Sequence, residues 1–306
     1  MKKILASFTL MALAASVANA ADGTWTNDGS STWSTTGNWA DGIVADGAGS
    51  LADFSTIDIT ANRYVTLDTS RTIGGLSFRD TNWTNSGFNW NLQSSGGSIL
   101  TLDNTGGPGG NPPTITLSTG ISSITTVLAG SNGLNVSLPW SNYDATRGTA
   151  SGGFGLVLSE TTARLIFNAE NTVSGALSVN GGVINTYGAF STFGNVTSLA
   201  LSGNSFFQNG EIGSGNPANN NGRVNRIGDG TATLTLGGAS GAGTFSSAFA
   251  QSSNTTSQTF AGLTVNAGQN ILNTSGTVAG TNNLIFTGTA GHDLCDWHRH
   301  RPRAPA

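Results

Sequence analysis

Residues 177–188 read LSVNGGVINTYG, and residues 263–276 read LTVNAGQNILNTSG. Both segments run Leu, hydroxyl residue, Val, Asn, small residue, Gly, and each continues with an apolar pair followed by Asn-Thr. A looser copy, LNVS, begins at Leu134. Repetition of one short unit favours a solenoid over a sandwich or a barrel, because each repeat covers its neighbour. The separation of 86 residues predicts about four windings between the copies, at roughly 20 residues a winding.

Short runs of alternating apolar and polar residues surround these copies and predict many strands, while no segment of the mature chain has convincing helical periodicity. The clearest runs are Tyr64–Leu67, Ile99–Leu102, Thr114–Leu117, Leu156–Leu158, Leu199–Leu201, Thr233–Leu236 and Leu284–Phe286. We expect Phe167, Leu177, Val179 and Ile184 to point inward, and the corner 180–182 to use positive φ. The residues after Thr60 then predict about eleven windings and a rod on the order of 50 Å long.

The longer segment RLIFNAENTVSGALSVNGGVINTYG, residues 164–188, resembles the autotransporter-associated β-strand repeat. NTVSG at 171–175 stands at that family's N-T-Y-S-G position, and LSVNGG at 177–182 stands at T-x-V-N-x-G. RTIGGLSF at 71–78 and LAGSNGL at 128–134 are also similar to such passengers. The resemblance implies an all-β, right-handed parallel β-helix, secreted or displayed at a bacterial surface, with no catalytic residues to carry over. Autotransporters continue into a translocator barrel that we do not recognise here, so we expect either a truncated chain or another export route.

The two ends of the chain differ from its body. MKKILASFTLMALAASVANA has a basic start, an apolar stretch and an A-x-A site, which predicts a signal peptide cleaved after Ala20 and no transmembrane helix in the mature chain. HDLCDWHRHRPRAPA, residues 292–306, holds all three histidines and the only cysteine. Its spacing fits no zinc template, and we expect an aberrant, disordered tail from a frameshift or truncation. The predicted organisation is a signal peptide at 1–20, an N-terminal cap at 21–60, a solenoid at 61–291 and the tail.

Charge and residue inventory exclude several functions. Residues 21–291 contain seven arginines, fourteen acidic residues and no lysine. An acidic, lysine-free body lacks the basic surface that nucleic acid or anionic lipid requires. A Ser-His-Asp triad needs a histidine and a phosphate-binding loop needs a lysine, and neither residue type occurs between 21 and 291. We therefore expect no cofactor and no metal.

Tryptophans are the candidate binding residues. Trp25, Trp33 and Trp39 lie among small polar residues, where they could stack on sugar rings or cap the open end of the first winding. Solenoids need terminal caps, so the cap is the favoured interpretation. Trp83 and Trp90, in TNWTNSGFNWN, form a second candidate patch, because inserted loops often carry contacts.

Two pairs of carboxylates could support glycoside hydrolysis if adjacent windings brought them together: Asp58 with Asp68, and Glu160 with Glu170. No spacing singles them out, and the basic residue that lyase chemistry needs is scarce. We therefore predict a structural or adhesin-like protein without catalytic activity, secreted or at the cell surface. The alternative is a carbohydrate-binding or polysaccharide-degrading β-helix. Extracellular polysaccharide or cell-surface components are the expected partners.

Overall fold

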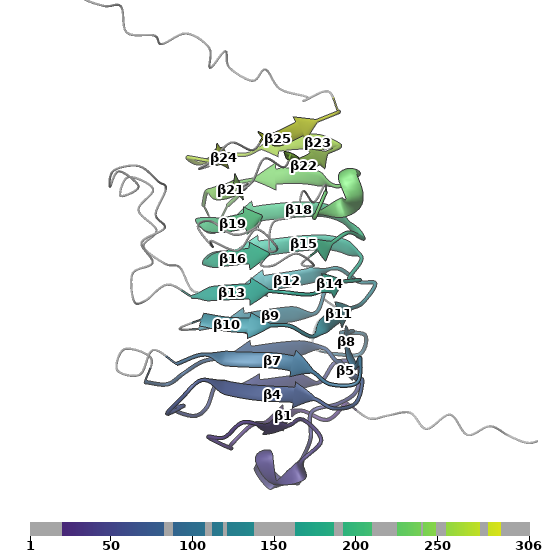
Figure 1. Cartoon of the computed structure of the whole chain (residues 1–306), viewed down its shortest axis with the longest axis vertical. Coiled ribbons are helices and arrows are strands. Elements are labelled where there is room, and N and C mark those ends of the chain that lie inside the picture. Colours follow the sequence, from purple (N-terminus) through teal and green to yellow (C-terminus); the bar gives the residue numbers. More distant parts are fainter. Residues whose placement is uncertain are drawn as a thin grey trace, which may run out of the picture.

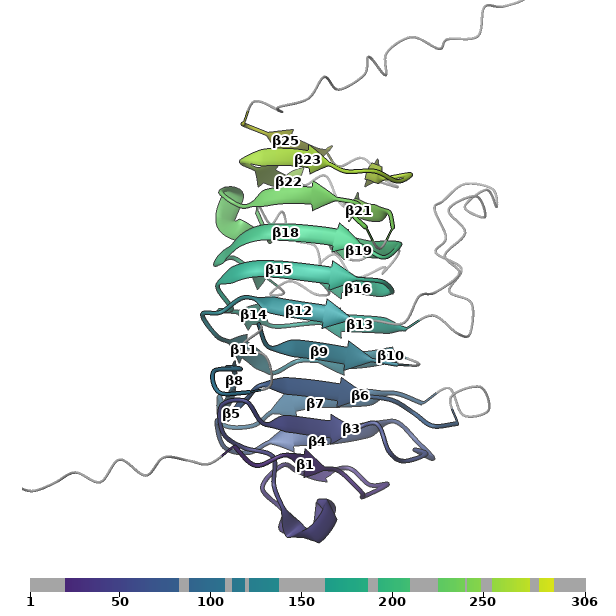
Figure 2. The ribbon, with the colours of Figure 1, turned by 180° about the vertical axis from the view of Figure 1, so that it is seen from behind.

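The computed structural model describes residues 20–82, 88–107, 112–118, 121–137, 163–186, 192–209, 225–239, 241–248, 255–275 and 281–288. In these ranges the chain winds upward from its N-terminal end as a stack of parallel strands (Figure 1). In Figure 2, the strands of the near face run from left to right as the chain climbs, which makes the coil right-handed. The chain is therefore an all-β, right-handed parallel β-helix, as the sequence predicted.

Two nine-stranded parallel sheets form most of the wall. The first contains β1 (Gly23–Thr24), β3 (Leu51–Phe54), β6 (Gly75–Phe78), β9 (Thr114–Leu117), β12 (Leu134–Ser137), β15 (Gly175–Asn180), β18 (Val196–Ser202), β20 (Thr233–Leu236) and β23 (Gly262–Val265). The second contains β2 (Ser31–Thr32), β4 (Arg63–Leu67), β7 (Trp90–Ser94), β10 (Ile121–Ile124), β13 (Arg164–Phe167), β16 (Val183–Thr186), β19 (Ser205–Asn209), β21 (Gly243–Ala248) and β24 (Ile271–Ser275).

A third side is interrupted. It contains the three-stranded sheet β5 (Arg71–Ile73), β8 (Ile99–Leu102) and β11 (Val127–Ala129), and the pairs β14 (Glu170–Asn171) with β17 (Thr192–Phe193) and β22 (Thr255–Phe260) with β25 (Thr281–Phe286). Three 3-10 turns also occur among the described residues: η1 (Thr36–Asn38), η2 (Ala40–Gly42) and η6 (Gly228–Gly230).

Alternation within each strand places one set of side chains inside the coil, where the parallel register aligns them in columns. Leu134, Leu177, Leu199 and Leu234 are successive partners in the first sheet, and each is at most 1% exposed. Phe54 and Phe78 stack at 5.4 Å between ring centroids in the same sheet. Burying one such side chain is worth about 1.5–3 kcal/mol relative to leaving it in water. Each winding thus stabilises its neighbours, as expected for a solenoid.

The windings are longer and fewer than the sequence predicted. Leu177, Leu199, Leu234 and Leu263 follow one another in the first sheet, so the two repeat copies lie three windings apart rather than four. The intervals between them are 22, 35 and 29 residues. Additional residues enter at the corners between strands, where the ladder tolerates insertions. Nine stacked strands, spaced by about 4.8 Å, give a rod of about 40 Å.

Corner residues and most strands match the expectations, but the cap boundary does not. Gly181 and Gly182 have φ of 81° and 61°, so the Asn-Gly-Gly corner uses the conformations that glycine tolerates best. The predicted run 156–158 lies outside the described residues. The predicted division at residue 60 is wrong as a limit of the solenoid, since β1 already pairs in parallel with β3 and β3 with β6. The cap consists instead of inserted residues folded over the first winding.

Candidate functional site

The first windings hold most of the titratable side chains of the described part of the chain. A catalytic or ligand-binding site that uses charged groups is therefore most plausible there. Nine aspartates and three arginines lie between residues 20 and 107. Loops at the ends of short strands carry most of them. Because one winding follows another directly, residues about 30 positions apart in sequence come into contact here.

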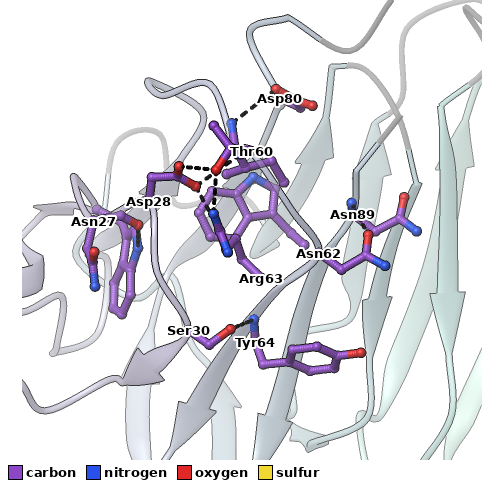
Figure 3. Close-up of polar contacts among 12 residues, drawn as sticks. Asn27, Asp28, Ser30, Thr60, Asn62, Arg63, Tyr64, Asp80 and Asn89 are labelled. Carbon is purple, nitrogen blue, oxygen red and sulfur yellow. Dashed lines mark hydrogen bonds and ion pairs between the residues drawn. The ribbon is translucent and has the colours of Figure 1, made fainter. Parts of the chain in front are cut away.

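Asp28 accepts hydrogen bonds from two residues of the next winding (Figure 3). Its Oδ1 accepts hydrogen bonds from the backbone N–H of Thr60 (3.1 Å) and from Nε of Arg63 (2.7 Å), and its Oδ2 accepts one from the Thr60 hydroxyl (2.7 Å). The Arg63 guanidinium also donates to the Thr60 hydroxyl through Nη2 (2.7 Å). The bond from Arg63 and those from Thr60 lower the pKa of Asp28 to about 2, against the opposing effect of burial.

A second ionic group joins the cap to the wall. The Oδ2 atom of Asp46 lies 2.6 Å from Nη1 of Arg71, and Nη2 of the same arginine donates to Oγ of Ser34 (2.7 Å). Ser34 in turn donates from its backbone N–H and its hydroxyl to Oδ1 of Asp68, at 3.1 and 2.9 Å. The chain of contacts therefore holds the loop after β2 against the winding that begins with β4 and β5.

Other aspartates accept hydrogen bonds from backbone N–H groups at turns. Asp22 accepts from Leu51 (2.7 Å). Asp80, only 2% exposed, accepts from Ile59 and Asn82 at 3.3 and 3.2 Å. Thr105 donates both its hydroxyl and its N–H to Asp103, and these bonds lower the pKa of that carboxyl. Short carboxylate side chains commonly satisfy backbone donors at turns in this way.

The resolved pKa shifts favour the ionised form of the carboxylates concerned. A general acid at neutral pH needs a raised pKa, whereas both resolved pKa shifts in the described residues, at Asp28 and Asp103, are downward. The pairs proposed from sequence gain no support from these contacts: Asp68 binds Ser34, and Asp58 lies 3.5 Å from the amide of Asn82. Glu160 lies outside the described residues. Nor do three His, Cys, Asp or Glu side chains gather as a metal site anywhere in the described ranges.

The tryptophans of the cap are core residues. Trp25, Trp33 and Trp39 are 0%, 0% and 2% exposed. The ring of each lies 5.6 Å from that of Phe54, and Trp39 lies 5.1 Å from Trp25 and 5.2 Å from Trp33. Their indole N–H groups donate to the backbone oxygens of Asn27, Ala45 and Trp33, respectively. The cap interpretation therefore describes these rings, and they present no free face to a sugar.

Trp90 also belongs to the interior. It is 2% exposed, lies 5.6 Å from the ring of Phe54, and donates its indole N–H to the carbonyl of Arg79. The prediction of a ligand-binding surface at Trp90 is corrected by this burial, because the alternation of β7 turns the ring inward. Trp83 lies outside the described residues.

Within the described ranges, the large aromatic side chain that faces water is Tyr64, which sequence reasoning missed. It is 45% exposed, and in Figure 3 its ring points away from the Asp28–Arg63 pair. Asn91 is its register partner on the adjacent strand, and Asn62 accepts a hydrogen bond from the backbone of Asn89 beside it. The signal was present in the run RYVTL, since the inward positions Val65 and Leu67 require the tyrosine between Arg63 and Val65 to point outward.

Comparison of the chain with protein-family models, curated proteins and solved structures gave no match. Among the described residues, no helix is both long enough and apolar enough to span a bilayer.

Proposed function

We propose that the chain is a secreted or cell-surface structural protein of the adhesin-like type, similar to autotransporter-associated repeat passengers and without catalytic activity. The observation that supports this proposal is the use made of the polar groups. In the first windings, carboxylates and guanidinium groups join neighbouring windings and satisfy turns, as Asp28 and Arg71 illustrate. Side chains committed in this way stabilise a rod and leave little chemistry free for a substrate.

The outer faces suit a spacer or an adhesive surface. Outward positions of the first sheet carry small polar residues, for example Thr116, Ser178, Ser202 and Thr235. These side chains carry no charge, so this face offers a neutral polymer hydroxyl groups without a local charge. A rod of about 40 Å presents them at a fixed distance from whatever anchors it.

Export is tested by expressing the full chain in a Gram-negative host and determining the mature N-terminus by mass spectrometry. We expect a chain that begins at Ala21, and cleavage of that chain when protease is added to intact cells. Accumulation of a chain that still begins at Met1 in the cytoplasm would contradict the proposal. Adhesion of cells or beads carrying the mature protein to polysaccharide-coated surfaces then tests the adhesive role.

Carbohydrate binding is the second candidate, and Tyr64 is the observation that favours it. An exposed aromatic face among asparagine amides resembles the combination that sugar sites use, since the ring stacks on the sugar while amides bind hydroxyl groups. A glycan array should show binding that Tyr64→Ala abolishes and Tyr64→Phe retains. Equal binding by wild type and Tyr64→Ala would exclude this site. A parallel hydrolysis screen would detect turnover, which neither candidate expects at this position.

A further inference from the structure

Among the described residues, nothing covers the core columns at the last layer of the solenoid. Val265 and Leu272 continue the columns of Leu236 and Phe245, which are 1% and 0% exposed. In the last layer the exposure rises to 51% for Val265 and 39% for Leu272. Leu263, Leu284 and Phe286 are likewise only partly buried where they pack against the core.

The same layer ends all three sides of the wall. Strands β23 and β24 are the last strands of the two nine-stranded sheets, and β25 is the outer strand of its pair with β22. An edge strand exposes a row of N–H and C=O groups that can pair with another strand, and proteins commonly protect such edges with charges or proline. Residues 230–291 contain no charged residue and no proline. Nothing in this composition discourages pairing.

The N-terminal end is closed by contrast. The Trp25–Trp39 bridge and the reciprocal bonds between Ala21 and Asp46 occupy the outer side of the first winding. The three cap tryptophans fill the core columns beneath it. A rod with one closed end and one open end cannot add copies head to tail without opening the cap.

We propose that the open layer formed by β23, β24 and β25 pairs with the same layer of a second copy, so that two rods join tail to tail. A twofold axis between the two copies places the open layer of one against the open layer of the other, so the apolar side chains of both are covered. The edge strands that meet carry no charge, and they do not repel each other. In each copy, the interface would contain β23, β24 and β25, with four, five and six residues, and the five-residue turn 266–270. The total of about 20 residues a side equals that of the smaller stable interfaces. Association then stops at two copies.

Composition favours a second copy over the chain's own C-terminal residues as the occupant. Residues 292–306 include two aspartates, three arginines, three histidines and two prolines. Charged groups lose their hydration when they cover an apolar layer, and proline cannot donate to a ladder. An identical layer carries neither cost.

Mass measurement of the mature chain tests the proposal. At protein concentrations up to about 100 µM, above the micromolar dissociation constants of weak interfaces, the wild type should be a dimer. The Val265→Lys variant should be a monomer, and its circular dichroism spectrum should equal that of the wild type. Thr264→Lys is the matched control, because Thr264 lies one position away on the outward face of the same strand and is already exposed. It should remain dimeric. A monomeric wild type, or a Val265→Lys protein that stays dimeric, would overturn the proposal.

Spin labels distinguish the orientation of the two copies. In a Cys295→Ser background, a label at Thr264→Cys should report a short distance between copies, whereas a label at Ile43→Cys should not. Ile43 is 47% exposed and lies in the cap, so a tail-to-tail dimer places the two Ile43 positions roughly 80 Å apart. A short distance between a label at 43 and one at 264 on different copies would indicate head-to-tail growth and overturn the proposal, as would labels that report no contact between copies.

Discussion

The first windings and the later windings from β16 to β22 share one backbone ladder but satisfy their polar groups differently. In the first, charged side chains at partly exposed turns join neighbouring windings: Asp28 with Arg63, and Asp46 with Arg71. In the later windings that contain β16, β19 and β22, neutral side chains do so inside the coil. The Thr186 hydroxyl donates to Oδ1 of Asn209 (3.1 Å), and Nδ2 of Asn209 donates to Oε1 of Gln258 (3.3 Å).

Solvation explains the difference. A charge buried in the coil would cost several kcal/mol, whereas a neutral amide costs little once its hydrogen bonds are made. Gln258 is 0% exposed, accepts from the N–H of Ile227 (3.1 Å), and donates to the carbonyls of Ile227 and Thr259 (both 2.9 Å). The first windings, the lower region, should therefore respond to pH and salt, and the Thr186–Asn209–Gln258 network of the upper region to changes of shape and hydrogen bonding.

The largest expected effect is at the cap. Trp33→Ala removes a fully buried indole and its hydrogen bond to Ala45, and should lower the free energy of unfolding of the first windings by about 3–5 kcal/mol. Urea unfolding with hydrogen exchange would measure this. Because each winding contacts mainly its neighbours, exchange should rise near β2 and β4 and stay unchanged near β23.

Ile43→Ala is the matched control for the cap, since Ile43 belongs to the same loop but is 47% exposed. It should cost less than about 0.5 kcal/mol. Equal effects of Trp33→Ala and Ile43→Ala would mean that the tryptophans do not close this end of the core.

The second expected effect breaks the buried amide network. Gln258→Leu keeps approximate volume but leaves the N–H and carbonyl of Ile227 without their side-chain partner, and should cost about 2–4 kcal/mol. Gln93→Leu is the control, because the Gln93 amide makes a single bond to Thr66 on the partly exposed outer face (3.0 Å). Its cost should stay below about 1 kcal/mol. A similar loss in both variants, measured by urea unfolding, would show that the interior position of the amide is unimportant.

The regularity of the fold was predictable because alternation and repetition are local signals. Leu177 and Val179 are inward, as expected, and the Asn-Gly-Gly corner has the expected positive φ. The length of each winding was not predictable, because the 35 residues from Leu199 to Leu234 carry no repeat signal that marks how many lie at a corner. The repeat copies alone could not show that two of the three windings between them are longer than the first.

The candidate site was harder to predict because composition does not reveal burial. Trp90 lies among polar residues in the sequence, and only the register of β7 with β4 shows that its ring enters the core. The aspartate contacts depend on which windings adjoin: Asp28 meets Thr60 and Arg63 only because the second winding returns directly above it. Tyr64 was accessible to sequence reasoning from strand alternation, without any knowledge of tertiary contacts.

A smaller effect is expected from Asp28→Asn, which removes a charge from the lower region. The pKa of Asp28 is lowered from 3.8 to about 2 in the folded protein, so its carboxylate stabilises the fold above pH 4 and loses that contribution as the pH falls from about 4 to about 2. The side chain is 33% exposed, and solvent screening limits the contribution to about 1 kcal/mol. Wild type should exceed the variant by that amount at pH 7, and the gap should close near pH 2.

Asp41→Asn is the control for charge removal, because Asp41 is exposed and asparagine tolerates its φ of 54°. Urea unfolding at pH 7 and pH 2.5 would compare the two variants. A gap for Asp28→Asn that persists unchanged at low pH would show that the Asp28 charge makes no stabilising contact.

The smallest expected effect is a difference in salt response between the two regions. Raising NaCl from about 0.05 to about 0.5 M shortens the screening length severalfold and should weaken the Asp46–Arg71 pair, whose side chains are 42% and 21% exposed, by less than about 0.5 kcal/mol. Residues 230–291 have no charged side chain to screen. Hydrogen exchange at the N–H of Thr72, which donates to Asp46, should therefore rise relative to that of Thr259, which donates to Asn225. General effects of salt act on both amides, so an unchanged ratio would mean that the ionic contacts add nothing to the backbone ladder.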